Sequence, residues 1–340
     1  MKLAETSNLS YLGHEHIAVD RDVTLLLAHQ FKISTFNLFN YLAPPGAYYE
    51  FENIYTRQQW QDKQQWLSRQ IERSDADIIG FQEIFSPDEL QQQLKTLGYN
   101  YFACVDTPVI KDDFIHSEPV VGIASRYPLL SVTAVQGESQ AVNELDFAFS
   151  RTPIHAVVEL PYLGKIDVVV VHFKSQRPME LSQRSDTLMS VERWRSTMQR
   201  GLEARFVSAF LAQRKSQLGY PQLLVGDFNR TLHSAEFCCF IEEAQGVPSP
   251  LQDAKTLMVE ATPFIATHYY GAKGSVLDYV LLSEEFDRNS AACLYEVSDY
   301  QVADAHLVNP IYAIDRMASD HGLVTVTLRA RDLSLNDDLP

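Results

Sequence analysis

Short apolar runs alternate with turn-forming residues along most of the chain, starting near residue 29. Each run is rich in valine, isoleucine or leucine, which is typical of β-strands. The predicted strands are Phe31–Phe36, Ala76–Phe81, Val120–Ala124, Ile154–Leu160, Ile166–Val171, Gln222–Val225, Val276–Leu282 and Leu323–Leu328. Several of these runs are apolar at almost every position, so we expect sheets that are covered on both faces.

Helical patterns separate the strands. The segment Arg57–Arg73 predicts a helix, because residues at helical spacing form one stripe while the remaining positions are polar. That stripe consists of Trp60, Gln64, Leu67 and Ile71. Ser86 is a typical helix N-cap in front of a proline, so a second helix is predicted over Pro87–Leu97, ending at Gly98. The stretch Ser182–Arg214 predicts one or two more helices.

The order of these elements favours one fold class. Strands that are close in sequence, such as Ile154–Leu160 and Ile166–Val171, predict antiparallel pairs joined by short turns. We therefore expect an α/β (α+β) fold, in which two mostly antiparallel sheets pack together with helices outside. The predicted organisation is an N-terminal extension over residues 1–28, a single domain over 29–332 and a tail over 333–340.

Composition and charge narrow the possible functions. Hydrophobic residues make up 46% of the 340 residues, which is enough for a large core. The formal net charge is −16, which excludes a strongly basic protein that wraps nucleic acid through many phosphate contacts. It does not exclude an enzyme that contacts one or two phosphates through a bound cation.

The cysteine content and the apolar runs bear on the location of the protein. The four cysteines show no C-x-x-C spacing and are expected to be reduced thiols. No apolar run is long enough to span a membrane, and residues 1–20 lack the pattern of a secretory signal. We therefore expect a cytoplasmic protein without a membrane span.

Polar residues of a few types follow several of the predicted strands. Taken singly, such a residue is typical of a turn or a helix N-cap. Together, these residue types are suited to binding a hard cation and to transferring protons. Because the ends of neighbouring strands lie at one edge of a packed sheet, residues that are distant in the sequence can meet there. These residues are Asn37, Glu83, His172, Asp227, Asn229, Asp320 and His321.

Seven short motifs resemble those of the endonuclease/exonuclease/phosphatase family, in its deoxyribonuclease I-like branch. They are Thr35-Phe36-Asn37, Gly80-Phe81-Gln82-Glu83, Ser125-Arg126-Tyr127-Pro128, His172-Phe173-Lys174-Ser175, Gly226-Asp227-Phe228-Asn229, Leu277-Asp278-Tyr279 and Ser319-Asp320-His321. The likeness runs from about Phe31 to Leu328. It implies a metal-dependent phosphoesterase with a four-layered sandwich, in which helices flank two central mixed, mostly antiparallel β-sheets.

The resemblance implies a divalent-cation site. Glu83 would be the main carboxylate ligand of Mg²⁺, for which Mn²⁺ can substitute. Asn37 and Asp320 would assist directly or through water, since Mg²⁺ prefers hard oxygen ligands. Asp227 would orient or deprotonate the attacking water, or bind a second cation.

Further roles are implied for residues around this cation. His321 would bind the scissile phosphate or transfer a proton. Asp278 would fix the tautomer of the His321 imidazole. His172 matches a second histidine of the deoxyribonuclease I branch, with Glu118 as a candidate carboxylate partner.

Two residues are candidates for binding the phosphate. Asn229 lies two residues after Asp227, so along an extended chain it would face the same way and donate to a phosphate oxygen. Arg151, in the segment Phe149–Pro153, resembles the phosphate-contacting arginine of the branch, although Thr152 stands where an acid is usual.

The leading functional hypothesis is a nuclease that acts on DNA or RNA. The pair of histidines and Arg151 favour it, whereas the negative charge does not. The alternatives are a phosphatase or phospholipase-type enzyme that acts on a small phosphoester, and an inactive scaffold that binds a partner. We interpret His268 as a packing residue beside the site, and the remaining histidines as structural or surface residues.

Overall fold

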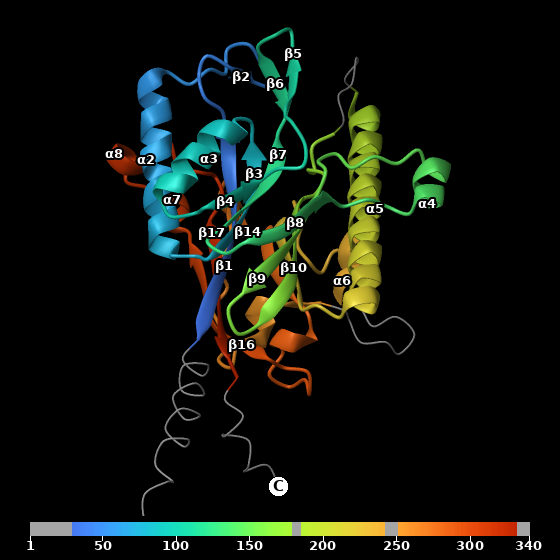
Figure 1. The fold of residues 1–340 in the computed structure, drawn as a ribbon. Coiled ribbons are helices and arrows are strands. Elements are labelled where there is room, and N and C mark those ends of the chain that lie inside the picture. The colour runs from blue at the N-terminus through green and yellow to red at the C-terminus, as the bar shows by residue number, and fades with distance from the viewer. Residues whose placement is uncertain (1–28, 179–184, 242–250, 332–340) are drawn as a thin grey trace, which may run out of the picture.

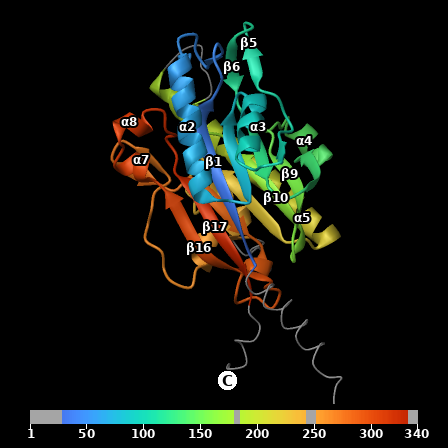
Figure 2. The same ribbon diagram turned by 60° about the vertical axis from the view of Figure 1, so that its left-hand side comes forward.

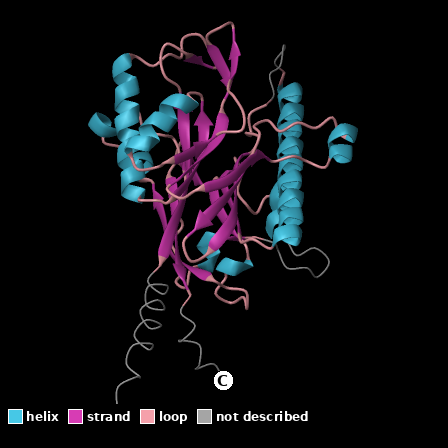
Figure 3. Ribbon diagram, in the orientation of Figure 1, coloured by secondary structure: helices cyan, strands magenta, loops and turns pink. Residues whose placement is uncertain are grey.

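The computed structural model describes residues 29–178, 185–241 and 251–331. The expected N-terminal extension and C-terminal tail therefore lie outside the described residues. Two six-stranded sheets pack face to face, with helices on their outer faces (Figure 1, Figure 3). The predicted four-layered sandwich is confirmed.

The first sheet contains both the first and the last of the described long strands. Its order is β16 (Tyr295–Ala303), β17 (Leu323–Ala330), β1 (Gln30–Tyr41), β3 (Ile78–Ile84), β7 (Val120–Ser125) and β4 (Tyr101–Ala103). Strands β1 and β3 are parallel, and the other neighbours are antiparallel. The expectation of mixed, mostly antiparallel sheets holds here.

The second sheet has the same arrangement of strand directions. Its order is β12 (Gln252–Asp253), β15 (Asp278–Leu282), β11 (Gln222–Asp227), β10 (Gly164–His172), β9 (Ile154–Leu160) and β8 (Leu129–Ala134). Strands β10 and β11 are parallel, and the other neighbours are antiparallel. Smaller sheets are formed by β2 (Ala47–Tyr48), β5 (Val109–Lys111) and β6 (Ile115–Glu118), and by β13 (His268–Tyr270) and β14 (Lys273–Ser275).

Helices cover the outer face of each sheet. Against the first sheet lie α2 (Arg57–Ser74) and α3 (Pro87–Thr96), and Figure 2 shows α2 in front of β1. Against the second sheet lie α5 (Asp186–Leu218) and α6 (Cys238–Ile241). The other described helices are α4 (Ser139–Glu144), α7 (Ala305–Val308) and α8 (Tyr312–Asp315), with short 3-10 turns at Ala235–Phe237, Ala254–Leu257 and Glu284–Phe286. No helix of the described chain is both long and apolar enough to cross a bilayer.

The core consists of three apolar layers. The central layer lies between the two sheets and includes Ile33, Ile78, Val168, Val225 and Val326, which are completely buried. The outer two layers lie between each sheet and its helices. Strands such as β10 contribute side chains to the layers on both of their faces, which explains their continuous apolar runs. Full burial of each such side chain stabilises the fold by about 1.5–3 kcal/mol.

The helices differ from the predictions in three details. In α2 the buried residues include Lys63 and Trp66 beside Leu67 and Ile71, so the stripe is rotated from the predicted one. The hydroxyl of Ser86 does not cap α3, because it accepts a hydrogen bond from Ala43 N at 2.9 Å. The third helical region is one helix, α5, which runs beyond Arg214 until the left-handed Gly219 ends it.

A buried ion network joins the second sheet to α5. Asp167 in β10 is completely buried and binds His155 Nε2 at 2.7 Å. The same carboxylate also binds Arg214 Nη2 at 2.7 Å. Although burial alone raises the pKa of Asp167, its bonds to His155 and Arg214 hold that pKa below the ordinary value of 3.8. The charged carboxylate therefore stabilises the folded state.

Asp167→Asn is expected to lower the free energy of unfolding by about 3 kcal/mol at pH 7, because it removes the charge that binds the buried His155 and the partly buried Arg214. The stabilisation from a lowered carboxyl pKa is fully present above pH 3.8 and is lost as the pH falls through the lower value of the folded protein. Urea unfolding of both proteins from pH 7 to pH 3 measures this difference. A difference that persists unchanged at acidic pH would contradict the interpretation.

Candidate active site

The candidate residues converge at one edge of the two sheets. Strands β10 and β11 end there, and β15 begins there, so Asp227 pairs with His172 on one side and with Asp278 on the other. The side chain of Asn37, in β1 of the first sheet, reaches across and its Nδ2 donates to Asp227 Oδ2 at 3.1 Å. Residues from both sheets therefore form a single cluster.

Local distortions of two strands aim Glu83 into this cluster. The pairing of β1 with β3, and of β3 with β7, shifts in register beside Glu83, which is typical of a β-bulge. Glu83 has φ 60°, a backbone conformation that costs about 1–3 kcal/mol for a residue other than glycine. Its carboxylate accepts from Asn37 Nδ2 at 3.3 Å and from Asn40 N at 3.0 Å. The strain is thus offset by bonds that fix the carboxylate.

Glycine is required immediately before Asp227. A Cβ on Gly226 would overlap the carbonyl oxygen of Val171 in the neighbouring strand, so the close approach of β10 and β11 depends on it. The strand then ends at Asp227, and the chain turns at Asn229 in a left-handed conformation with φ 57°.

The extended chain that we expected from Asp227 to Asn229 is therefore wrong. Because of the turn, Asn229 N donates to Asp227 Oδ1 at 2.7 Å. The side-chain Nδ2 of Asn229 donates to Phe173 O at 2.9 Å and to Asp227 Oδ2 at 3.3 Å. The side-chain amide of Asn229 therefore contacts Asp227 and Phe173, and its role in binding a phosphate stays a prediction.

His321 lies against a buried carboxylate. Its Nδ1 is 2.8 Å from Asp278 Oδ2, which leaves Nε2 facing Asp227 Oδ2 and Asp320 Oδ1, each at 3.9 Å. The hydroxyl of Ser319 ties this segment to β1 by donating to Asn37 O at 2.7 Å. Burial alone would lower the pKa of His321, but Asp278 and then Asp227 raise it well above the ordinary value. The imidazole is therefore held in its cationic form.

His172 has the opposite electrostatic environment. Burial, and then the nearby charges of Arg151 and His321, lower the pKa of His172 well below its ordinary value. Its Nε2 is 3.4 Å from Asp227 Oδ2, and its Nδ1 has no hydrogen-bond partner among the described residues. Glu118, the carboxylate we expected beside it, is exposed on β6. Two imidazoles whose pKa values are shifted in opposite directions thus face the same carboxylate.

The carboxylates of the cluster form an arrangement that fits a divalent cation. Burial, with a smaller contribution from Asp278, raises the pKa of Asp227 to about 7, although His321 lowers it. Ligand atoms of Asp227, Asp278 and His321 all lie within 4.8 Å of one another, and so do those of His268, Asp320 and His321. Both groups include His321, which could bind a metal only through an unprotonated nitrogen, so the carboxylates of Asp227, Asp278 and Asp320 are the hard donors here. Hard oxygen donors and an excess of buried negative charge are features that a bound Mg²⁺ would satisfy.

Arg151 supplies positive charge close to His172. It lies between α4 and β9, and its Nη1 is buried without a hydrogen-bond partner among the described residues. A buried guanidinium donor without a partner is unusual and suggests that an anion completes the site. The neighbouring Thr152, which departs from the expected acid, donates to Asp106 Oδ2 at 2.8 Å.

His268, interpreted from the sequence as a packing residue beside the site, places its ring 4.9 Å from that of His321. One residue of the site, Lys63, was not recognised from the sequence. Lys63 is 3% exposed, and its ammonium lies 5.7 Å from the ring of Phe39 and 5.6 Å from that of Tyr55. Burial lowers the pKa of Lys63 to about 8, although Glu83 and then Asp320 raise it. Its spacing of four residues from Leu67 was the available signal.

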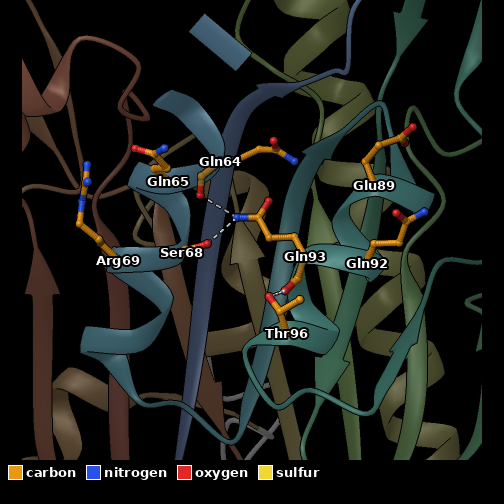
Figure 4. A pocket seen from close by; sticks show the side chains of 8 residues that line it. All are labelled: Gln64, Gln65, Ser68, Arg69, Glu89, Gln92, Gln93 and Thr96. Atoms are coloured by element: carbon orange, nitrogen blue, oxygen red, sulfur yellow. Dashed lines mark hydrogen bonds between the residues drawn. The ribbon is translucent and has the colours of Figure 1, made fainter. Parts of the chain in front are cut away.

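A separate cleft lies away from this cluster, between α2 and α3. It has a volume of about 550 Å³, and four of its eight lining residues are glutamines (Figure 4). The amide of Gln93 crosses it and donates to Gln64 O at 2.7 Å and to Ser68 Oγ at 2.8 Å. These bonds join the two helices, and the cleft contains none of the predicted site residues.

Comparisons with solved structures show the same fold. The catalytic domain of human Nocturnin, determined with a bound sulfate anion, is similar over 89% of this chain and 95% of its own, with 16% identity and a TM-score of 0.58. A humanized D. rerio TDP2 is similar over 88% and 99%, with 14% identity and a TM-score of 0.55. A family protein from Bacteroides thetaiotaomicron is similar over 90% and 96%, with 18% identity and a TM-score of 0.54. At these identities the likeness shows the fold.

No curated protein matches the chain significantly. The sequence profile of the Endonuclease/Exonuclease/phosphatase family, however, matches residues 35–321. This match spans most of the chain and includes the strand-end residues from Asn37 to His321. The chain therefore belongs to the endonuclease/exonuclease/phosphatase family, which typically comprises metal-dependent phosphoesterases and nucleases.

Proposed function

We propose that this protein is a divalent-metal-dependent phosphodiesterase that cleaves nucleic acid. The observation that carries the proposal is the cluster around Asp227, in which His172 Nε2 at 3.4 Å and His321 Nε2 at 3.9 Å face one buried carboxylate. The pKa of His172 is lowered and that of His321 is raised. Environments that push the pKa values of neighbouring groups apart are typical of acid and base pairs in catalysis. Deoxyribonuclease I-like members have two histidines in this arrangement, as the resemblance described above implies.

The metal would be held by oxygen ligands at the edge of the first sheet. Glu83, Asn37 and Asp320 are the proposed ligands, with Mg²⁺ as the cation and Mn²⁺ as a substitute. When bound, the cation would neutralise charge on the phosphoryl oxygens.

The protein's own groups would perform the proton transfers. Asp227, whose pKa of about 7 suits a general base, would orient a water and accept its proton, and His172 would assist it. His321, kept protonated by Asp278, would donate a hydrogen bond or a proton to the phosphate from Nε2. Arg151 would bind a phosphate oxygen through its unpartnered Nη1.

One observation favours a second candidate function. The net charge of −16 repels a long polyanion, so a hydrolase of a small phosphoester is the alternative. The basic residues near the site, among them Arg151 and Lys174, reduce this objection, because they provide local positive charge where a phosphate would bind.

The test is a panel of substrates incubated with Mg²⁺, with Mn²⁺ and with a chelator. Plasmid DNA, single-stranded DNA, RNA and a bis-aryl phosphodiester report nuclease and phosphodiesterase activity, and a phosphomonoester reports phosphatase activity. We expect cleavage of at least one nucleic acid, abolished by the chelator and restored by added metal.

Other results would redirect the proposal. Release of inorganic phosphate from the monoester with intact nucleic acids would indicate the small-phosphoester enzyme. Absence of activity on every substrate with either metal would indicate a binding scaffold. Full activity in the presence of the chelator would contradict metal dependence.

A further inference from the structure

The buried face of α5 changes from polar to apolar along the helix. Its C-terminal half buries Val207 and Leu211 against the second sheet. In the preceding turns the equivalent buried positions are Ser196, Arg200 and Glu203, each only 1% exposed. Burying polar or charged groups costs free energy unless each is bonded, so this half of the helix needs specific partners. We call these three residues the α5 clamp.

Glu203 joins two loops that approach the site. Its Oε1 accepts hydrogen bonds from Ser150 N at 2.8 Å and from Ser150 Oγ at 2.6 Å. Its Oε2 accepts from Lys174 N at 2.7 Å. Ser150 immediately precedes Arg151, and Lys174 follows His172 by two residues. A single carboxylate thus fastens together the backbones that carry Arg151 and Lys174.

The other two residues of the clamp hold the same loop after β10. Arg200 Nη1 donates to Lys174 O at 2.8 Å, so the N–H and the carbonyl of Lys174 are both bound by α5. Arg200 Nη2 forms an ion pair with Glu236 Oε1 at 2.7 Å. Ser196 Oγ donates to Arg177 O at 2.8 Å. The loop is therefore fixed at several points by side chains that belong to one rigid helix.

The side chains that this arrangement positions are cations. Arg151 has a buried Nη1 without a partner, and its charge lowers the pKa of both His172 and Lys174. Lys174 is half-buried, and its ammonium donates to Ser175 Oγ and to Arg177 O at 3.4 Å each. Like charges held close together repel one another unless an anion lies between them. A rigid support is what keeps such a pair in place before the anion binds.

We propose that Ser196, Arg200 and Glu203 are positioning residues that hold Arg151 and Lys174 against a substrate phosphate. The role rests on the proposed phosphoesterase function, because it assumes that the anion is the phosphate of the substrate. None of the three touches the reacting atoms. Their effect passes through the backbones of Ser150 and of residues 174–177.

Glu203→Gln tests the proposal. Glutamine has a single acceptor oxygen, so either Lys174 N–H or Ser150 N–H loses its acceptor, and the bridge between the two backbones is broken. We expect the dissociation constant of inorganic phosphate, measured by calorimetry, and the KM of the substrate each to rise about tenfold, the effect of one charge-assisted hydrogen bond. Loss of negative charge alone would tighten phosphate binding, so the direction of the change separates positioning from electrostatics.

Two further variants keep the test independent of folding. Ser196→Ala removes one hydrogen bond without a change of charge and is expected to weaken phosphate binding about threefold. In an Arg151→Ala background, Glu203→Gln should have a smaller effect than in the wild type, because the two residues act through the same contact. Asp167→Asn is the matched control, since it also neutralises a buried, bonded carboxylate yet should leave phosphate affinity and KM unchanged.

The outcomes distinguish this proposal from the proposed function. Unchanged or tighter phosphate binding by Glu203→Gln, with wild-type KM, would overturn the clamp while leaving the phosphoesterase intact. Weaker phosphate binding in a protein that hydrolyses no phosphoester would support the clamp and reject the phosphoesterase. Equal losses of phosphate affinity in Glu203→Gln and Asp167→Asn would mean that general destabilisation is the cause, and would also overturn the clamp.

Discussion

Replacing Asp227 with alanine is expected to lower the rate of phosphodiester hydrolysis at least ~10³-fold at saturating metal and substrate. Asp227 is the only side chain among the described residues that is bonded to Asn37 while facing both His172 and His321. Its removal eliminates the proposed base and uncouples the two sheets at the site. The measurement is kcat on the best substrate of the panel, together with circular dichroism to verify folding.

The matched control for Asp227 lies on the neighbouring strand. Asp167→Asn and Asp227→Asn both neutralise a fully buried carboxylate of the second sheet. They differ in environment, because the pKa of Asp167 is lowered by its partners whereas burial raises that of Asp227. We expect the first to lose stability and the second to lose activity. Near-wild-type kcat in Asp227→Asn would reject the assigned role.

His321→Ala is expected to cause a loss of similar size, at least ~10³ in kcat, because it removes the proposed donor to the substrate phosphate. Its Nδ1 is occupied by Asp278, so Nε2 is the atom available to the substrate. The effect should appear in kcat more than in KM, since a proton donor acts mainly in the transition state. Steady-state kinetics of the variant measure this division.

A second buried histidine–aspartate pair provides the comparison. His155 in β9 and Asp167 in β10 are bonded at 2.7 Å, close to the 2.8 Å of His321 and Asp278, but they lie away from the end of β10 that carries His172. His155→Ala should therefore lower the melting temperature and leave kcat within about twofold of the wild type. A comparable loss of kcat in both alanine variants would show that the His321 effect is only structural.

The periodicity of the chain was sufficient for most of the fold. All eight predicted strands are present, because continuous apolar runs require burial on both faces. Strands β8 and β16 were not predicted, since they lie at sheet edges and expose part of their residues, which weakens the apolar signal. The end of the second helix near Gly98 was predicted from the sequence, whereas the end of α5 at Gly219 was not, although a left-handed glycine marks both ends.

The candidate site was predicted in its composition but not in its bonding. Strand ends indicated that Asn37, Asp227 and His321 meet, and the structure brings them together. The extended chain predicted at Asn229 and the predicted pairing of His172 with Glu118 were wrong. Both depend on which atoms come within hydrogen-bonding distance after folding: Asn229 binds Phe173, and His172 faces Asp227.

Apolar periodicity and turn chemistry are short-range properties, so residues within a few positions of one another specify strands, helices and the polar groups at their ends. The burial of Lys63 and Glu203, in contrast, depends on residues that are far away in the sequence. Their partners lie on other strands and loops, and a charged side chain in a helix looks solvated until the packing is known. The contact of α5 with the loops at Ser150 and Lys174, and of β1 with β11, decided which charges are buried, and with them the electrostatics of the site.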